Sequence, residues 1–218
     1  MLVGAAICPH PPLLVPELAA GAAHELDALR GACDEAVGRV LRAQPTVIAV
    51  VGRASSGARL ASTGGSFTGF GVPLIVGEGD TGLPLAHTVG CWLLDRAGWT
   101  GPRPYYGATD DAQPDVADAE RLGLLVMGDA AARRSERAPG YFDPRAEEYD
   151  ATVAAALRTG PEAVAALDGD LARELLAAGW PAWQVLARAT SGGQWSCDLL
   201  YDGAPYGVGY LVGSWLPT

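Results

Sequence analysis

Short apolar runs alternate with longer stretches of helical periodicity along most of the chain. The run Thr46–Val51 is continuous and rich in β-branched residues, which is typical of a strand that is covered on both faces. Others are bounded by Gly and Pro, which mark the ends of strands. The predicted strands cover Leu2–Cys8, Thr46–Val51, Val72–Val76, Leu122–Met127, Cys197–Tyr201 and Gly207–Val212.

Apolar residues at spacings of three and four predict helices between these strands. The predicted helices cover Pro16–Arg42, the segment from Leu85 to about Gly98, Pro144–Arg158, and Pro161–Ala189 with a break at Gly179-Trp180-Pro181. Strands that alternate with helices favour an α/β fold, in which a mostly parallel, twisted central sheet carries helices on both faces. The 218 residues fit a single domain spanning 1–218.

Net charge and hydropathy argue against nucleic-acid binding and membrane association. The net charge is −10, and the one basic cluster (Arg133, Arg134 and Arg137) is interrupted by Glu136, so a nucleic-acid-binding surface is not expected. No run approaches the roughly 18 apolar residues of a membrane span, and the first residues lack a signal-peptide pattern, which predicts a cytoplasmic protein without membrane association.

The four cysteines are far apart and have apolar neighbours. They form no CxxC pair, which argues against a zinc site and a disulfide framework. We therefore expect buried free thiols at Cys8, Cys33, Cys91 and Cys197.

Polar side chains follow the first four predicted strands, where α/β sheets collect their ligands. We expect them to share one rim around a cleft, with His10, Arg53, Ser55 and Glu78 binding a ligand. Asp129 and Arg133 are the candidate catalytic residues. The full set that follows these strands is His10; Arg53, Ser55 and Ser56; Glu78 and Asp80; and Asp129, Arg133 and Arg134.

Each candidate has a structural alternative. His10 fits an exposed loop, Asp129 fits a turn cap, and the two arginines fit a solvated helix start. His24 lies off the apolar stripe of its helix and is expected to face solvent, whereas His87 is expected to be structural.

Two common enzyme classes do not fit. Ser55 and Ser56 lack a GxSxG elbow, and a chain without lysine cannot form a P-loop. The glycine-rich segment Thr63–Gly69 predicts a flexible loop or lid.

Four segments carry a family resemblance. Gly4–Leu18 (GAAICPHPPLLVPEL), Leu85-Ala86 with the following helix, Val126–Arg145 and Ala204–Val212 occur in the order of the predicted strands. Together they resemble the class III extradiol dioxygenase superfamily, which is built around the catalytic subunit of protocatechuate 4,5-dioxygenase and includes Memo-like proteins. The likeness is closest to short actinobacterial members, and it implies a LigB-like sheet and a homodimer.

The resemblance implies an iron site that this chain only partly matches. Such enzymes hold Fe(II) with two histidines and a carboxylate, and a further histidine acts as acid and base. His10 matches the first metal ligand, but Gly52-Arg53 stands where the second is expected. Gly128–Arg133 places arginine at or beside the acid/base position, and no Glu marks the late carboxylate position near Trp180–Trp183.

Arginine cannot replace either histidine, because it has no free lone pair and stays protonated. We therefore expect a degenerate metal site without a cofactor, inactive in ring cleavage. The old cleft would bind a small anionic or aromatic molecule or a protein partner, with Arg53 and Arg133 suiting a carboxylate or phosphate. The alternative is a metal-dependent oxygenase or hydrolase, in which His10, Glu78 and Asp129 hold Fe(II) or another divalent metal.

Overall fold

A six-stranded mixed sheet forms the centre of the computed structural model, which describes residues 1–116 and 119–218. The strand order is β5-β2-β6-β1-β8-β7. The first four are mutually parallel, whereas β8 is antiparallel to both β1 and β7. The strands are β1 (Leu2–Cys8), β2 (Val47–Arg53), β5 (Tyr105–Ala108), β6 (Leu122–Met127), β7 (Trp195–Gly203) and β8 (Tyr210–Pro217).

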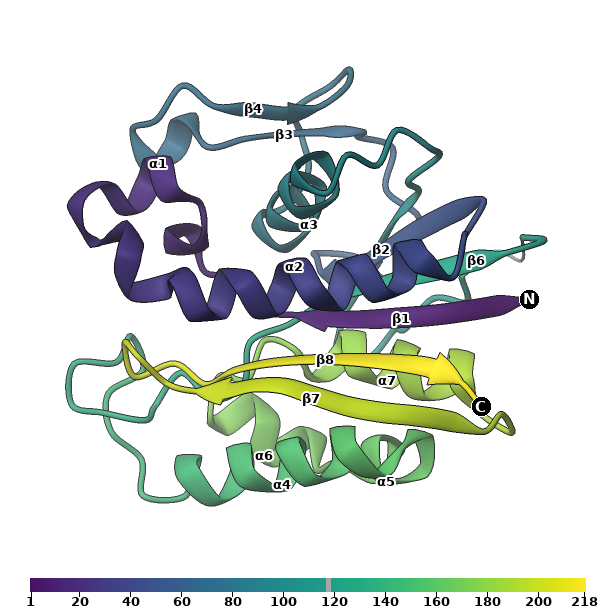
Figure 1. Cartoon of the computed structure of the whole chain (residues 1–218). Helices are drawn as coiled ribbons and strands as arrows, with labels where there is room; N and C mark the ends of the chain where they lie inside the picture. Colours follow the sequence, from purple (N-terminus) through teal and green to yellow (C-terminus); the bar gives the residue numbers. More distant parts are fainter. Residues whose placement is uncertain (117–118) are drawn as a thin grey trace.

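Helices cover both faces of this sheet, as the alternating pattern predicts (Figure 1). On one face lie α2 (Asp27–Arg42) and α3 (Leu85–Arg96). On the other lie α4 (Ala146–Thr159), α5 (Pro161–Ala165), α6 (Gly169–Glu174) and α7 (Trp180–Thr190). Every residue of β6 is buried, because this central strand packs against helices on both sides. None of the described helices combines the length and the apolar character that crossing a bilayer requires.

The first predicted helix is divided in the structure. A 3₁₀ turn η1 (Pro12–Leu14) and α1 (Pro16–Ala19) precede a 3₁₀ segment η2 (Ala20–Leu26), and regular α-helix begins only at Asp27. Ala20 has a φ of 46°, which a continuous right-handed helix does not allow. The buried Arg30 side chain donates to the carbonyl of Leu14 at 3.0 Å and so fixes the divided segment against α2.

The strand predicted at Val72–Val76 does not join the central sheet. Instead β4 (Ile75–Gly77) pairs with β3 (Gly64–Ser66) in a separate antiparallel ribbon above α3 (Figure 1). The apolar pattern of Val72–Val76 does not indicate burial, because Ile75 is 64% exposed. The glycine-rich segment is also more ordered than a free lid, since it forms β3, the fully buried Phe67 and the 3₁₀ turn η3 (Thr68–Phe70).

The strand that completes the parallel sheet is β5, which the sequence pattern missed. It pairs with β2 in the register Val50↔Tyr105 to Arg53↔Ala108. The helical region predicted over Pro161–Ala189 has its predicted break just before α7, and it is divided once more, between α5 and α6. Asp168 begins α6 by accepting the backbone N–H groups of Asp170 and Leu171.

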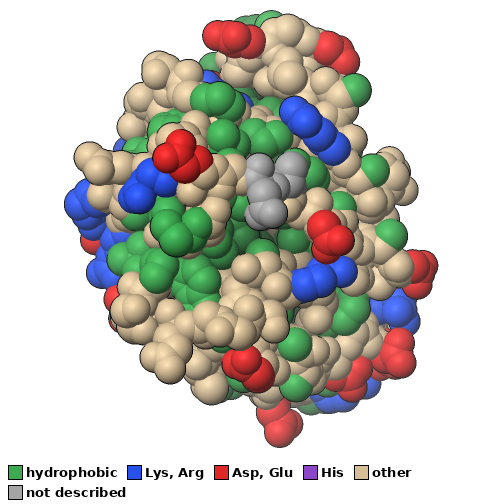
Figure 2. All heavy atoms as spheres, turned by 90° about the vertical axis from the view of Figure 1, so that its right-hand side faces the viewer, with side chains coloured by type: hydrophobic (Ala, Val, Ile, Leu, Met, Phe, Trp, Pro, Cys, Tyr) green, Lys and Arg blue, Asp and Glu red, His purple; other side chains and the backbone are tan. Residues whose placement is uncertain are grey.

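Three cysteines are buried free thiols as expected, but Cys197 lies on the edge strand β7 and is partly exposed. Figure 2 looks onto the amino ends of the parallel strands, where apolar side chains gather in a shallow hollow. A hollow of about 650 Å³ lies near both chain ends and is lined in part by Leu2, Trp195 and Pro217. The predicted site residues His10, Arg53 and Asp129 lie at the opposite ends of these strands.

Candidate site at the carboxyl edge of the sheet

The parallel strands end together at what we call the carboxyl edge (the ends of β5, β2, β6 and β1 at Ala108, Arg53, Met127 and Cys8). Four polar residues occur here in the order of the strands. They are Asp110 after β5, Arg53 at the end of β2, Asp129 after β6 and His10 after β1. The chain therefore brings three of the predicted site residues to one edge of the sheet.

His10 and Asp129 face each other because of the strand register. Cys8 pairs with Met127, and the N–H of Gly128 donates to the carbonyl of Cys8 at 2.9 Å, so the two chains stay together beyond the strands. Two residues past the last pair, the backbone N–H of His10 donates to Asp129 Oδ1 at 2.7 Å.

The same Asp129 oxygen lies 3.5 Å from His10 Nδ1, which is buried and has no hydrogen-bond partner among the described residues. The two side chains are only 11% and 15% exposed. Burial raises the pKa of Asp129, while the charge and N–H of His10 act in the opposite direction.

Arg53 and Asp110 form a second polar pair at this edge. Arg53 Nη2 lies 2.6 Å from Asp110 Oδ1, and Nη1 lies 3.4 Å from Oδ2. The guanidinium therefore forms a bidentate pair with the carboxylate. Arg173 on α6 approaches the same carboxylate at 3.6 Å. Asp110 was missed by the sequence analysis, because the strand that precedes it was not recognised.

The turn before α7 connects the two pairs. The N–H of Gly179 donates to the Asp129 carbonyl at 2.8 Å, and the Ala178 carbonyl accepts Arg53 Nε at 3.4 Å. A Cβ on Gly128 would overlap Gly179 Cα, so the close approach of this turn requires glycine. The turn therefore packs directly onto the ends of β2 and β6.

His87 lies beneath the end of β2 from the side of α3. A Cβ on Gly52 would lie 3.3 Å from His87 Cε1 and 2.9 Å from Ala86 Cβ. The imidazole is fully buried, and its Nε2 is 2.9 Å from the Tyr106 carbonyl. Burial lowers the pKa of His87 to about 4, helped by the charge of His10. His87 is thus a core residue, whereas His24 is exposed on η2, both as expected.

Of the two arginines after β6, Arg134 is held through its side chain and Arg133 through its backbone carbonyl. The partly buried Arg134 pairs with Asp150 at 2.9 Å, and Asp150 also accepts the Ala131 N–H at 2.8 Å. The Arg133 carbonyl accepts the Asp143 N–H, and within the described part of the chain the buried Nε of Arg133 has no hydrogen-bond partner.

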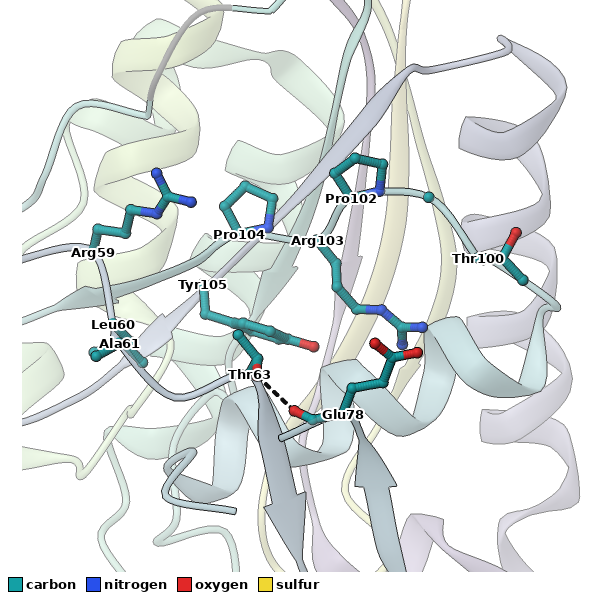
Figure 3. A pocket seen from close by; sticks show the side chains of 11 residues that line it. Arg59, Leu60, Ala61, Thr63, Glu78, Thr100, Pro102, Arg103, Pro104 and Tyr105 are labelled. Carbon is teal, nitrogen blue, oxygen red and sulfur yellow. Dashed lines mark hydrogen bonds between the residues drawn. The ribbon is translucent and has the colours of Figure 1, made fainter. Parts of the chain in front are cut away.

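Ser55, Ser56, Glu78 and Asp80 are the remaining predicted residues. Ser55 and Ser56 are exposed in the bend after β2. Asp80 accepts a hydrogen bond from Ser62 at 2.9 Å. Glu78 follows β4 and lines a pocket with Arg103 and Tyr105 at the amino end of β5, away from the carboxyl edge (Figure 3). The structure therefore does not bring Glu78 to His10 and Asp129.

The residues at the carboxyl edge do not fit the iron set that the resemblance implies. His10 and Asp129 offer two donors, but Arg53 occupies the place of the second histidine, and His87 Nε2 is engaged by a carbonyl. In the described part of the chain, no three His, Cys, Asp or Glu residues are grouped so as to hold a metal ion.

Comparison with known proteins adds no assignment. The chain matches no protein-family model, and no curated protein is significantly similar to it.

Proposed function

We propose that this chain is a divergent extradiol-dioxygenase-like protein that does not cleave aromatic rings and that binds a small carboxylate at Arg53. The observation that carries the proposal is the two-pronged pair between Arg53 and Asp110 at the end of β2. The resemblance places a metal-binding histidine there. A guanidinium binds carboxylates but repels a metal cation, so the substitution changes the class of ligand that suits the site.

Asp110 illustrates how a ligand carboxylate would bind. Its oxygens accept from both Nη groups of Arg53, the geometry that arginine prefers for carboxylates. The Arg53 side chain is 36% exposed, so a ligand in solution has access to it. Such a ligand must displace Asp110, and we therefore expect weak binding that becomes stronger when the competing carboxylate is removed.

Benzoate is a suitable probe, because it combines an aromatic ring with one carboxylate. In titrations followed by NMR, Asp110→Asn is expected to raise benzoate affinity about tenfold, and Arg53→Gln to abolish binding. Asp34→Asn is the matched control, since Asp34 forms an equally two-pronged pair with Arg96 on α3. Equal gains in both Asn variants, or no binding to Asp110→Asn, would contradict the proposal.

Ring cleavage is tested separately with protein supplied with Fe(II) in air. Oxygen uptake with protocatechuate and with catechol is expected to equal that of Fe(II) alone. Uptake above this blank that disappears in His10→Ala would show that the chain is a dioxygenase after all.

A metal-dependent oxygenase or hydrolase is the second candidate. It is favoured by the 3.5 Å approach of His10 Nδ1 to Asp129 Oδ1, since a histidine and a carboxylate are common metal ligands. Such a metal site requires further ligands besides His10 and Asp129. Glu78 is not one of them, because it lies at the amino end of β5. Stoichiometric iron, zinc or manganese that is lost in both His10→Ala and Asp129→Ala would favour this candidate. A cytoplasmic location, a homodimer and a protein partner stay predictions.

A further inference from the structure

Three exposed apolar side chains lie where the loop after β6 meets the turn after α6. Tyr141 is 76% exposed, Phe142 is 57% exposed and Leu176 is 47% exposed. A Cβ on Gly140 would lie 2.7 Å from Leu176 Cδ1, so the loop and the turn are in contact. We call Tyr141, Phe142 and Leu176 the Tyr141 patch. A contiguous group of large apolar side chains on a protein surface usually marks an interaction site.

The two segments that carry the Tyr141 patch are joined by hydrogen bonds and ion pairs. The Ala132 N–H donates to the Leu175 carbonyl at 3.0 Å. Arg145 bridges the same segments, because its guanidinium lies 2.8 Å from the Asp143 carboxylate and 2.7 Å from the Glu174 carboxylate. A surface that is ordered in advance loses less conformational entropy on association.

The backbone is strained at two positions of the Tyr141 patch. Tyr141 and Leu176 have φ angles of 59° and 57°, in the left-handed region that residues with a side chain rarely adopt. Their N–H groups donate to the Ala138 carbonyl at 3.0 Å and to the Arg173 carbonyl at 3.2 Å. Strained turns that carry exposed apolar side chains are typical of functional surfaces, and contact with a partner explains them here.

Charges of both signs precede the Tyr141 patch in the chain. Glu136 and Arg137 are exposed in the turn that the Ala138 N–H closes onto the Ser135 carbonyl at 3.0 Å. This turn directly precedes the turn closed by Tyr141. Within the described residues neither Glu136 nor Arg137 forms an ion pair. One free anion and one free cation therefore lie side by side in the chain next to the apolar side chains.

We propose that the Tyr141 patch is the contact between two copies of this chain that are related by a two-fold axis. In such a contact every pair of residues occurs twice, so Glu136 of each copy pairs with Arg137 of the other. An acidic peptide or an anionic membrane would pair with Arg137 but would place a like charge against Glu136. A second copy satisfies both residues.

The charge of the whole chain also favours this surface as the contact. The net charge is −10, so two copies repel each other through most of their surfaces, and a region with balanced charges is where they approach at least cost. Beyond the expectation of a homodimer, the inference assigns the surface and the charge pairs through which the copies meet. It does not depend on the carboxylate site at Arg53.

Sedimentation velocity on the full chain tests the apolar part of this contact. The chain is expected to form dimers within the range of about 1–100 μM. Tyr141→Ser and Phe142→Ser should each raise the dissociation constant of the dimer about tenfold or more, because aromatic side chains at the centre of an interface supply most of its affinity. Ile75→Ser is the matched control, since Ile75 is 64% exposed on β4 and should leave the dimer unchanged.

Charge reversal tests the two-fold arrangement. Glu136→Arg and Arg137→Glu should each weaken the dimer, because like charges then face each other across the axis. An equimolar mixture of these two variants should associate again, since each copy then meets the opposite charge at both positions. Recovery in the mixture also shows that neither variant is simply misfolded.

Several results would overturn the inference. The first is a chain that stays monomeric at about 100 μM. The second is a dimer that both Tyr141→Ser and Phe142→Ser leave unchanged. The third is a mixture of the two charge variants that associates no better than either variant alone. A monomeric chain that binds phosphatidylserine vesicles, and loses this binding in Phe142→Ser, would assign the Tyr141 patch to a membrane instead.

Discussion

The backbone N–H of His10 donates to the carboxylate of Asp129 at 2.7 Å, and the same oxygen lies 3.5 Å from the imidazole Nδ1. One carboxylate thus accepts the main-chain N–H of the residue that follows β1 and lies beside its ring. The pair extends the contact between β1 and β6 beyond the last pair of the ladder, Cys8 and Met127. Asp129 therefore has a structural role that is independent of any ligand.

Removing this acceptor is expected to destabilise the fold. Asp129→Ala leaves a largely buried N–H without its partner, which costs about 1–3 kcal/mol in the free energy of unfolding. Asp129→Asn should cost less, because the amide oxygen still accepts the bond and the desolvated charge is gone. Urea unfolding measures both variants. Asp115→Asn is the control, since that side chain is 90% exposed. Equal losses in the Ala and Asn variants would contradict this role.

His87 is expected to make stability fall at moderately acid pH. Its pKa is lowered from 6.5 to about 4 by burial, so the unfolded chain takes up a proton at higher pH than the folded one. The contribution of His87 is therefore complete above pH 6.5 and is lost as the pH falls toward 4. A shift of this size corresponds to about 3 kcal/mol.

The measurement compares the unfolding free energy at pH 7.5 and pH 4.5. His87→Gln keeps a donor for the Tyr106 carbonyl but does not titrate, so its pH dependence should be shallower by most of that amount. His24→Gln is the matched control, because His24 is exposed and should leave the pH dependence unchanged. An unchanged slope in His87→Gln would show that His87 is not buried in its neutral form.

Gly52 is expected to tolerate no side chain. A Cβ there would lie 2.9 Å from Ala86 Cβ and against the His87 ring, so Gly52→Ala overpacks the contact between β2 and α3. We expect a loss of about 1–3 kcal/mol by urea unfolding. Gly31→Ala on α2 is the comparison, because that Cβ would meet no described atom within 4 Å. It should raise stability by about 0.5–1 kcal/mol through better helix propensity.

The long buried strands β1, β2 and β6 were predicted closely, whereas the short buried strand β5 and the surface ribbon were not, for a physical reason. β1, β2 and β6 are buried along most of their length, so their apolar runs are continuous. β5 has only four residues, includes Gly107 and follows Pro104, which hides a strand signal. Val72–Val76 has an apolar pattern, but a short pattern does not distinguish a central strand from a surface ribbon.

The candidate site was predicted to the extent that it depends on those strands. His10 and Asp129 were found because they follow β1 and β6, whose positions were expected, whereas the pairing of the two strands is known only from the structure. Glu78 was assigned to the wrong edge, because β4 lies outside the central sheet. Asp110 and the turn at Ala178 gave no signal, since a partner from a distant loop cannot be found without the fold.

The pair between Arg134 and Asp150 provides a last test of how the loop after β6 is held. Asp150 is only 2% exposed, and its two bonds connect α4 to the backbone at Ala131 and to Arg134. Arg134→Gln leaves a buried carboxylate without its charged partner, which should cost about 2–3 kcal/mol. Arg158→Gln breaks only the half-exposed 3.8 Å pair with Asp202 and should cost less than about 0.5 kcal/mol. Equal urea midpoints for the two variants would show that burial does not strengthen the Arg134 pair.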